Sequence, residues 1–263
     1  MSRSDFALPG FIESPTKASW NDLVLPEDCI KSLREYVLWV KHRDQVEREW
    51  KAMLTGGPVA LFSGPSGTGK TFASNILGST LGLDLFRTNL GQLASKHIGE
   101  TEKNLNALFD ALSNEPMLLV FDEADSLFGK RSEVKDAHDR YANFEVSYLL
   151  ARLERYRGPV VLTTNNRDRF DTAFRRRLQF VIDFPLPDES ERARLWRLYL
   201  PARAPMDRNI DTDKLARKAA LTGGQIRNAA VHAAFLAAGA ASSISLKHIS
   251  SAIRSELAKT KSS

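Results

Sequence analysis

The chain has 263 residues, of which 43% are hydrophobic and 26% charged, which is the composition of a globular protein with one or two domains. Its single cysteine, Cys29, excludes an internal disulfide, and no apolar run reaches the roughly 18 residues of a membrane span, so we predict a cytoplasmic protein with no membrane segment. The net charge of +5 permits contact with nucleic acid but does not by itself predict it.

The first third of the chain predicts an arm, a long helix and a strand. Residues 1–19 are rich in serine and proline and have few apolar anchors, which indicates a flexible N-terminal arm. From Pro26 to about Leu54, apolar residues recur at every third or fourth position, the pattern of an amphipathic helix. Glycines and a proline in 55–58 end this pattern, and the apolar run 58–63 is typical of a buried strand.

The stretch from Gly64 to Thr71 fits the phosphate-binding pattern G-x-x-x-x-G-K-[ST], and it lies between a predicted strand and a predicted helix. Gly67 and Gly69 allow the backbone to curl with its N–H groups inward, and the start of the next helix favours anions. We predict that Lys70 contacts the β- and γ-phosphates of a nucleotide and that the Thr71 hydroxyl holds Mg²⁺. The alternative is an ordinary glycine-rich turn. The predicted nucleotide-binding residues in this stretch are Gly64, Pro65, Ser66, Gly67, Thr68, Gly69, Lys70 and Thr71.

A buried strand with an acidic end is the second feature of the site. A strand is predicted at 82–88 and a helix from Thr101, and the strand 117–121 then leads directly into Asp122 and Glu123. Ligands of parallel sheets bind at the carboxyl ends of the strands. We therefore predict that Asp122 orients Mg²⁺ through a water molecule and that Glu123 polarises the attacking water. The alternative is an acidic turn without a catalytic role.

Two more strands, at 159–163 and 180–184, complete the predicted sheet. Strands that alternate with helices indicate an α/β fold, here a parallel five-stranded P-loop sheet sandwiched by helices. The strand at 159–163 can lie between the P-loop strand and the acidic strand, so the polar residues after it project toward the γ-phosphate. Asn165 is predicted to place the attacking water, with Asn166 as the second choice. The alternative is that Asn165 caps a turn.

Beyond a linker at 185–187, only helical patterns appear, and they predict a small all-α lid domain. The four predicted helices lie at about 188–200, 211–220, 223–240 and 245–258. The predicted organisation is an arm at 1–19, an α/β nucleotide-binding domain at 20–186 and a helical C-terminal domain at 187–263.

Together these motifs resemble those of the AAA+ ATPases, over roughly residues 20–258. The similarity also includes Thr163-Thr164-Asn165, the arginines 175–177 and Pro185-Leu-Pro-Asp188, and it is strongest to the classical AAA subgroup that contains katanin and spastin. The run 136–143 is similar to AAA+ ATPases associated with contractile injection systems. The resemblance implies a homo-hexameric ring that binds ATP and Mg²⁺ between subunits and hydrolyses the ATP.

The resemblance also implies roles for residues outside the two motifs. Arg176 and Arg177 match the family's arginine fingers, which reach the ATP of a neighbouring protomer; the alternative is a solvated basic turn. Arg227 is similar to the sensor 2 arginine, which touches the γ-phosphate and which the katanin-like subgroup usually lacks; the alternative is a surface arginine. His97 and Ile98 match the first pore loop, with His97 in place of the usual aromatic residue; the alternative is a plain surface loop.

Three functions are compatible with the phosphate-binding stretch. The one we favour is an ATP-hydrolysing AAA+ motor that remodels, unfolds or disassembles a protein complex, through a protein substrate or adaptor that the sequence does not name. The alternative is a nucleic-acid-associated AAA+ ATPase of the loader or transposition-helper type, although the sequence has no recognisable groove of stacking aromatic residues. A small-molecule kinase would leave Asn165 and the arginine cluster unexplained.

Overall fold

The structure is a computed structural model, and its helices and strands fall into two compact units. The described residues are 10–16, 18–93, 100–113, 115–126, 146–166, 170 and 172–260. The first unit comprises Met1–Trp20, Glu27–Gly64 and Lys70–Asp183, and the second comprises Asn21–Pro26, Pro65–Gly69 and Phe184–Ser263. The first unit thus ends at Asp183, before the expected boundary between 186 and 187, and the middle of the phosphate-binding stretch groups with the second unit.

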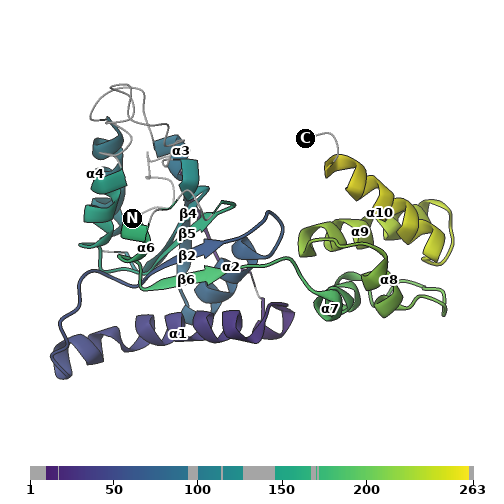
Figure 1. Ribbon diagram of the computed structural model, residues 1–263, viewed down its shortest axis with the longest axis horizontal. Helices are drawn as coiled ribbons and strands as arrows, with labels where there is room; N and C mark the ends of the chain where they lie inside the picture. Colours follow the sequence, from purple (N-terminus) through teal and green to yellow (C-terminus); the bar gives the residue numbers. More distant parts are fainter. Residues whose placement is uncertain are drawn as a thin grey trace. The chain divides into compact units, whose positions relative to one another are not determined.

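A six-stranded sheet organises the first unit, in the order β1-β3-β4-β5-β2-β6 (Figure 1). The strands are β1 Phe11–Glu13, β2 Val59–Ser63, β3 Asp84–Asn89, β4 Met117–Asp122, β5 Val160–Thr164 and β6 Phe180–Asp183. Strands β2 to β6 pair in parallel, which confirms the predicted parallel sheet. Strand β5 lies between β4 and β2, as its position in the sequence predicted. The sixth strand, β1, is not among the five predicted strands. It pairs antiparallel with β3 and comes from the stretch that was expected to be a flexible arm.

The helices before residue 176 are short, apart from α1, α2 and α4. The helical elements are η1 Trp20–Asp22, α1 Glu27–Asp44, η2 Gln45–Glu49, α2 Lys70–Leu81, α3 Leu90–Leu93, α4 Glu100–Leu112, η3 Ala124–Ser126 and α6 Thr172–Arg175, and residues 146–153 are also helical. Helix α1 continues into the π-helical turn η2 and stops before the predicted end at Leu54. Lys51 lies just beyond it with φ 58°, a left-handed conformation that a right-handed helix cannot include.

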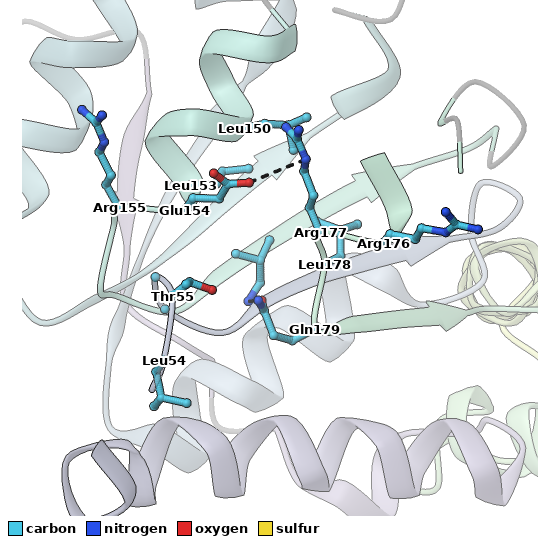
Figure 2. Close-up of a pocket in the computed structure, with 13 residues that line it drawn as sticks. Leu54, Thr55, Leu150, Leu153, Glu154, Arg155, Arg176, Arg177, Leu178 and Gln179 are labelled. Carbon is cyan, nitrogen blue, oxygen red and sulfur yellow. Dashed lines mark hydrogen bonds and ion pairs between the residues drawn. The ribbon is translucent and has the colours of Figure 1, made fainter. Parts of the chain in front are cut away.

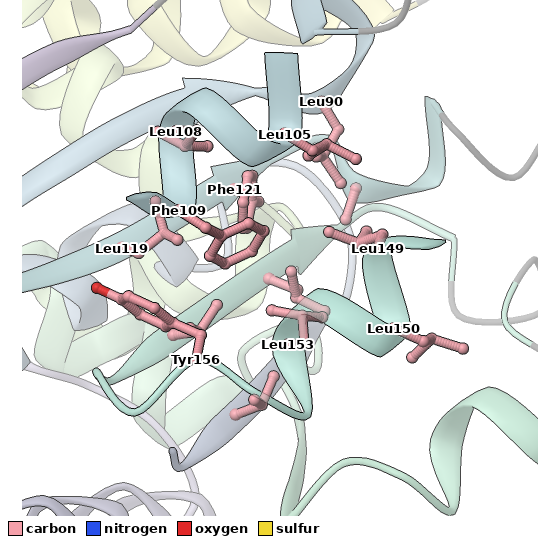
Figure 3. Packing of buried hydrophobic residues seen from close by; sticks show 14 of the residues in the cluster. Leu90, Leu105, Leu108, Phe109, Leu119, Phe121, Leu149, Leu150, Leu153 and Tyr156 are labelled. Atoms are coloured by element: carbon pink, nitrogen blue, oxygen red, sulfur yellow. The ribbon is translucent and has the colours of Figure 1, made fainter. Parts of the chain in front are cut away.

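Apolar side chains cover both faces of the sheet, because successive residues of a strand point to opposite faces. On one face, Leu119 and Phe121 of β4 pack against Phe109 of α4 and against the helical segment 146–153 (Figure 3). Helix α1 lies on the opposite side of the sheet from α4 (Figure 1), and it contacts α2 and β6 and buries Tyr36 completely. The sheet is therefore fixed from both sides, and the carboxyl ends of its strands are held in a constant arrangement.

The second unit is a small helical domain. Its helices are α7 Glu189–Tyr199, α8 Thr212–Lys218, α9 Gly223–Gly239 and α10 Leu246–Thr260, and each begins and ends within one turn of its predicted position. Trp196, Ile226 and Ile249 are fully buried in one cluster, and small residues such as Ala233 let α9 and α10 pack closely. None of the helices in the described ranges combines the length and hydropathy that a membrane crossing requires.

Asp188 caps the first helix of this unit, and its removal should be measurable. Its carboxylate accepts the backbone N–H of Glu191, which lowers the Asp188 pKa, and the Glu191 carboxylate in turn accepts the backbone N–H of Asp188. We expect Asp188→Ala to destabilise α7 by about 1 kcal/mol at neutral pH, measured by hydrogen exchange of the α7 amides. Glu189→Ala, which removes only a surface pair with Arg217, should cost about 0.5 kcal/mol or less.

The pH dependence of this difference has a defined sign. Because the folded-state pKa of Asp188 is lowered, its contribution is complete above the ordinary aspartate value of about 4 and is lost as the pH falls through the folded-state value. The gap between wild type and Asp188→Ala should therefore shrink in acid. An equal gap at neutral and acidic pH would show that the carboxylate charge does not contribute to the cap.

Candidate active site

Polar residues of four neighbouring strands meet at the carboxyl edge of the sheet in the first unit. Asn89 ends β3 in register with Asp122, which ends β4, and Asn165 follows β5. Gly64 follows β2, and its N–H donates to the carbonyl of Thr164 at 3.2 Å. This is the edge at which open α/β sheets bind their ligands. The strand-end residues that were predicted to form a site are therefore together.

Lys70, the first residue of α2, is buried at this edge. Its ammonium group donates to the Gly64 carbonyl at 2.6 Å and to Oδ1 of Asn165 at 2.9 Å. Burial lowers the pKa of Lys70, and the nearby carboxylates of Asp122 and Asp125 act in the opposite direction. Both of these oxygens are neutral, so an anionic phosphate oxygen attracts the ammonium group more strongly than they do.

Glu123 follows β4 in a strained backbone conformation, with φ 51°. Its Oε2 accepts a hydrogen bond from the Asn89 side-chain amide at 2.7 Å, and its carbonyl accepts the N–H of Ser126 at 2.9 Å. The side chain is exposed. Strain of this kind is typical of functional positions, and the contact with Asn89 fixes the direction in which the carboxylate points. The sequence motifs did not indicate Asn89.

Both carboxylate oxygens of Asp122 have partners. Nη1 of Arg87 donates to Oδ2 at 2.9 Å, and the Thr163 hydroxyl donates to Oδ1 at 3.0 Å. Thr71, the other predicted magnesium ligand, lies exposed in the first turn of α2. Within the described ranges there is no cluster of three His, Cys, Asp or Glu side chains that could hold a metal ion. One carboxylate and one hydroxyl are hard oxygen donors, and they fit Mg²⁺, which usually shares its site with substrate phosphates and water.

The middle of the phosphate-binding stretch, Pro65–Gly69, is described with the second unit. Gly67 has φ 79° and Gly69 has φ 108°, which are left-handed conformations that favour glycine. A Cβ atom added to Gly69 would meet nothing within 4 Å, so the backbone there borders open space that a phosphate group can enter. The Gly67 carbonyl accepts the N–H of Gly224, near the start of α9, at 2.9 Å.

Arg176 and Arg177 lie at the other edge of the sheet, where β2 and β6 begin. They line a pocket of about 620 Å³ whose other residues are Leu54, Thr55, Gly56, Gly57, Val59, Leu150, Leu153, Glu154, Arg155, Leu178 and Gln179. Figure 2 shows the two side chains diverging: Arg177 points toward Glu154, with 3.6 Å between Nε and Oε1, whereas Arg176 points away from it. Arg176 has no hydrogen-bond or ion-pair partner within the described part of the chain.

The remaining predicted positions are at the start of α9 or outside the described residues. Arg227 is exposed on α9, five residues after the capping residue Thr222. The predicted pore-loop residues His97 and Ile98 lie outside the described residues, and so does the run 136–143.

Residues 60–186 match the profile of the ATPase family associated with various cellular activities (AAA). Curated relatives include a proteasome-activating nucleotidase of Saccharolobus islandicus, 27% identical over 86% of this chain and 58% of the relative. A cell division cycle protein 48 homolog of Archaeoglobus fulgidus is 31% identical over 79% of this chain and 28% of its own length. A katanin p60 ATPase-containing protein of Danio rerio is 30% identical over 83% of this chain and 46% of its own length.

This chain therefore spans less than two thirds of each of these relatives. One of them carries the name of katanin, the protein whose subgroup the sequence motifs resembled most strongly. The family match begins inside β2 and extends beyond the end of β6, so it contains the phosphate-binding stretch, the acidic strand end and both predicted finger arginines. Over residues 60–186, this chain is similar to the AAA family of ATPases.

Proposed function

We propose that this protein hydrolyses ATP and uses the energy to remodel or take apart a protein complex. The observation that carries the proposal is the meeting of Lys70, Asp122, Glu123 and Asn165 at one sheet edge, where they are supplied by a helix start and two strand ends. A phosphate-binding ammonium, a magnesium-binding carboxylate, a base and a water-placing amide are the groups that phosphoryl transfer to water requires.

Each side chain has a distinct role in the proposed reaction. Lys70 leaves the oxygens of Gly64 and Asn165 and binds the β- and γ-phosphate oxygens. Asn165, released from Lys70, orients the attacking water, and Glu123 accepts its proton. Thr71 directly, and Asp122 through a water molecule, would hold Mg²⁺, which would supply positive charge to the phosphate group. Arg227 contacts the γ-phosphate of the same chain in this proposal, as its similarity to the sensor 2 position implies.

The position of Arg176 and Arg177 supports catalysis between subunits. They precede β6, whereas Gly64 follows β2, and the two strands run parallel with Ala60 opposite Phe180. Strand β2 has five residues, so the arginines and the start of the phosphate-binding stretch are separated by about 16 Å of strand. Arginines at that edge are far from the phosphate site of their own chain. Assembly into a ring, with a hexamer as our proposal, brings them to the nucleotide of a neighbour.

The protein-remodelling part of the proposal rests on the relatives. One carries the name of a nucleotidase that activates the proteasome, and another is named for the ATPase-containing part of katanin. The favoured occupant of the ring is thus a protein substrate or adaptor. The single cysteine supports the cytoplasm as the compartment.

To test the protein-remodelling role, ATP turnover is measured with an unfolded protein, single-stranded DNA, duplex DNA or RNA. Stimulation only by a nucleic acid would favour the loader or transposition-helper alternative.

Nucleotide affinity gives a direct test of Lys70. We expect Lys70→Ala to weaken ATP binding about 10- to 150-fold, because a hydrogen bond to a charged group contributes about 1.5–3 kcal/mol. The measurement is the equilibrium binding of a fluorescent ATP analogue. Lys41→Ala, which removes an exposed lysine in the last turn of α1, is the matched control and should bind like wild type. Unchanged binding by Lys70→Ala would place the phosphates elsewhere.

A further inference from the structure

A buried arginine connects the proposed magnesium site to the N-terminal edge strand. Arg87 lies in β3, and only 7% of its side chain is exposed. Its Nη1 donates to Asp122 at 2.9 Å, and its Nε donates to Oε2 of Glu13, in β1, at 3.3 Å. Its Nη2 is buried without a hydrogen-bond partner among the described residues. A guanidinium group that is buried between two carboxylates has little freedom to move.

We propose that Arg87 and Glu13 are positioning residues of the magnesium site, so that the N-terminal edge strand is part of the active site. The inference rests on the proposed function. Arg87 holds one oxygen of Asp122 and Thr163 holds the other, so the carboxylate plane is fixed. Partners that fix a metal-binding carboxylate typically change metal affinity about 10- to 100-fold when they are removed.

Glu13 has a second, electrostatic role in this proposal. Arg87 alone would neutralise Asp122 and weaken its attraction for a divalent cation. With Glu13 included, the three groups carry a net charge of −1, so the site keeps its attraction for Mg²⁺ while Arg87 still fixes the geometry. The residue before β1 packs tightly and helps to place Glu13, because a Cβ atom added to Gly10 would lie 2.7 Å from the Phe86 ring. Strand pairing with β3 then puts Glu13 opposite Leu85 and within reach of Arg87.

The test compares metal affinity with nucleotide affinity in the full chain. Mn²⁺ serves as the probe, and its binding in the presence of ADP is followed by electron paramagnetic resonance. We expect Glu13→Gln to weaken Mn²⁺ binding about tenfold and Arg87→Gln about 10- to 100-fold. Arg87→Lys keeps the positive charge but has one nitrogen in place of the two that bind the carboxylates. Its Mn²⁺ affinity should therefore fall between those of wild type and Arg87→Gln. ADP affinity in EDTA should stay within about threefold of wild type for all three variants, because the metal partners do not contact the nucleotide.

Two controls separate this inference from the proposed function and from general loss of structure. Asp110→Asn removes a carboxylate from another arginine pair of the same unit, with Arg152 at 2.6 Å, and should leave Mn²⁺ affinity unchanged. If Arg87→Gln does not fold, Glu13→Gln decides the question, because the backbone pairing of β1 does not depend on that side chain. Wild-type Mn²⁺ affinity in Glu13→Gln would overturn the inference. Failure of the wild-type chain to bind any nucleotide would instead overturn the proposed function.

Discussion

Glu123→Gln is expected to stop ATP turnover while ATP still binds. A carboxylate that accepts a proton from the attacking water contributes about 10²- to 10⁴-fold to the rate, and an amide cannot accept that proton at neutral pH. Glutamine has the same shape and keeps an oxygen for the Asn89 amide, so the strained backbone at φ 51° and the contact at 2.7 Å should survive. Single-turnover hydrolysis and equilibrium binding of ATP, measured on the same sample, separate the two effects.

The control for this variant is Glu35→Gln, which changes an exposed glutamate of α1, a helix that contributes no residue to the proposed site. It should turn over ATP at the wild-type rate. The glutamine variant at position 123 should also accumulate in the ATP-bound state, so it is the form with which to capture a bound protein substrate. Hydrolysis by Glu123→Gln at more than about a tenth of the wild-type rate would assign the base to another residue.

The position of β5 in the sheet and the location of the candidate site could be predicted because they depend on local patterns. A strand, a glycine-rich turn and a helix are adjacent in the chain, and their combination identifies the phosphate-binding stretch without tertiary information. In the sequence, one strand (β3) lies between the phosphate-binding stretch and the acidic strand β4. This order predicted that β5 can lie between β4 and β2 in the sheet. In a parallel sheet this order is enough to place Asn165 beside Lys70, and the structure has them 2.9 Å apart.

The partners of the two acids could not be predicted in the same way. Asn89 and Arg87 belong to a strand that is separated by α3 and α4 from the acids at the end of β4. Only the register of β3 with β4 brings them together. The one signal in the sequence was Arg87, a charged residue that directly follows the apolar pair Leu85 and Phe86 within the strand. Strand β1 was missed for a related reason: three residues that pair at an edge have too little pattern to be distinguished from a loose arm.

Replacement of Arg176 or Arg177 by alanine is expected to give the largest loss of turnover. An arginine that reaches the γ-phosphate in the transition state contributes about 10³- to 10⁵-fold to phosphoryl transfer. Arg176, which has no partner in the described part of the chain, is free to reach a neighbour, whereas Arg177 must first leave Glu154. Arg176→Ala should therefore cause the greater loss. Arg155→Ala, in the same pocket, is the matched control and should be close to wild type.

Mixing two inactive variants tests whether the arginine acts on a neighbour. A protomer with Arg176→Ala keeps its own phosphate site, and a protomer with Glu123→Gln keeps its arginines, so activity should return when the two are combined. In randomly mixed rings about one interface in four joins an intact site to an intact arginine. A mixture of Lys70→Ala with Glu123→Gln has no intact site and should stay inactive. If the first mixture is also inactive while both variants assemble with wild type, then the arginines do not act between subunits. Catalysis would then not require the proposed ring.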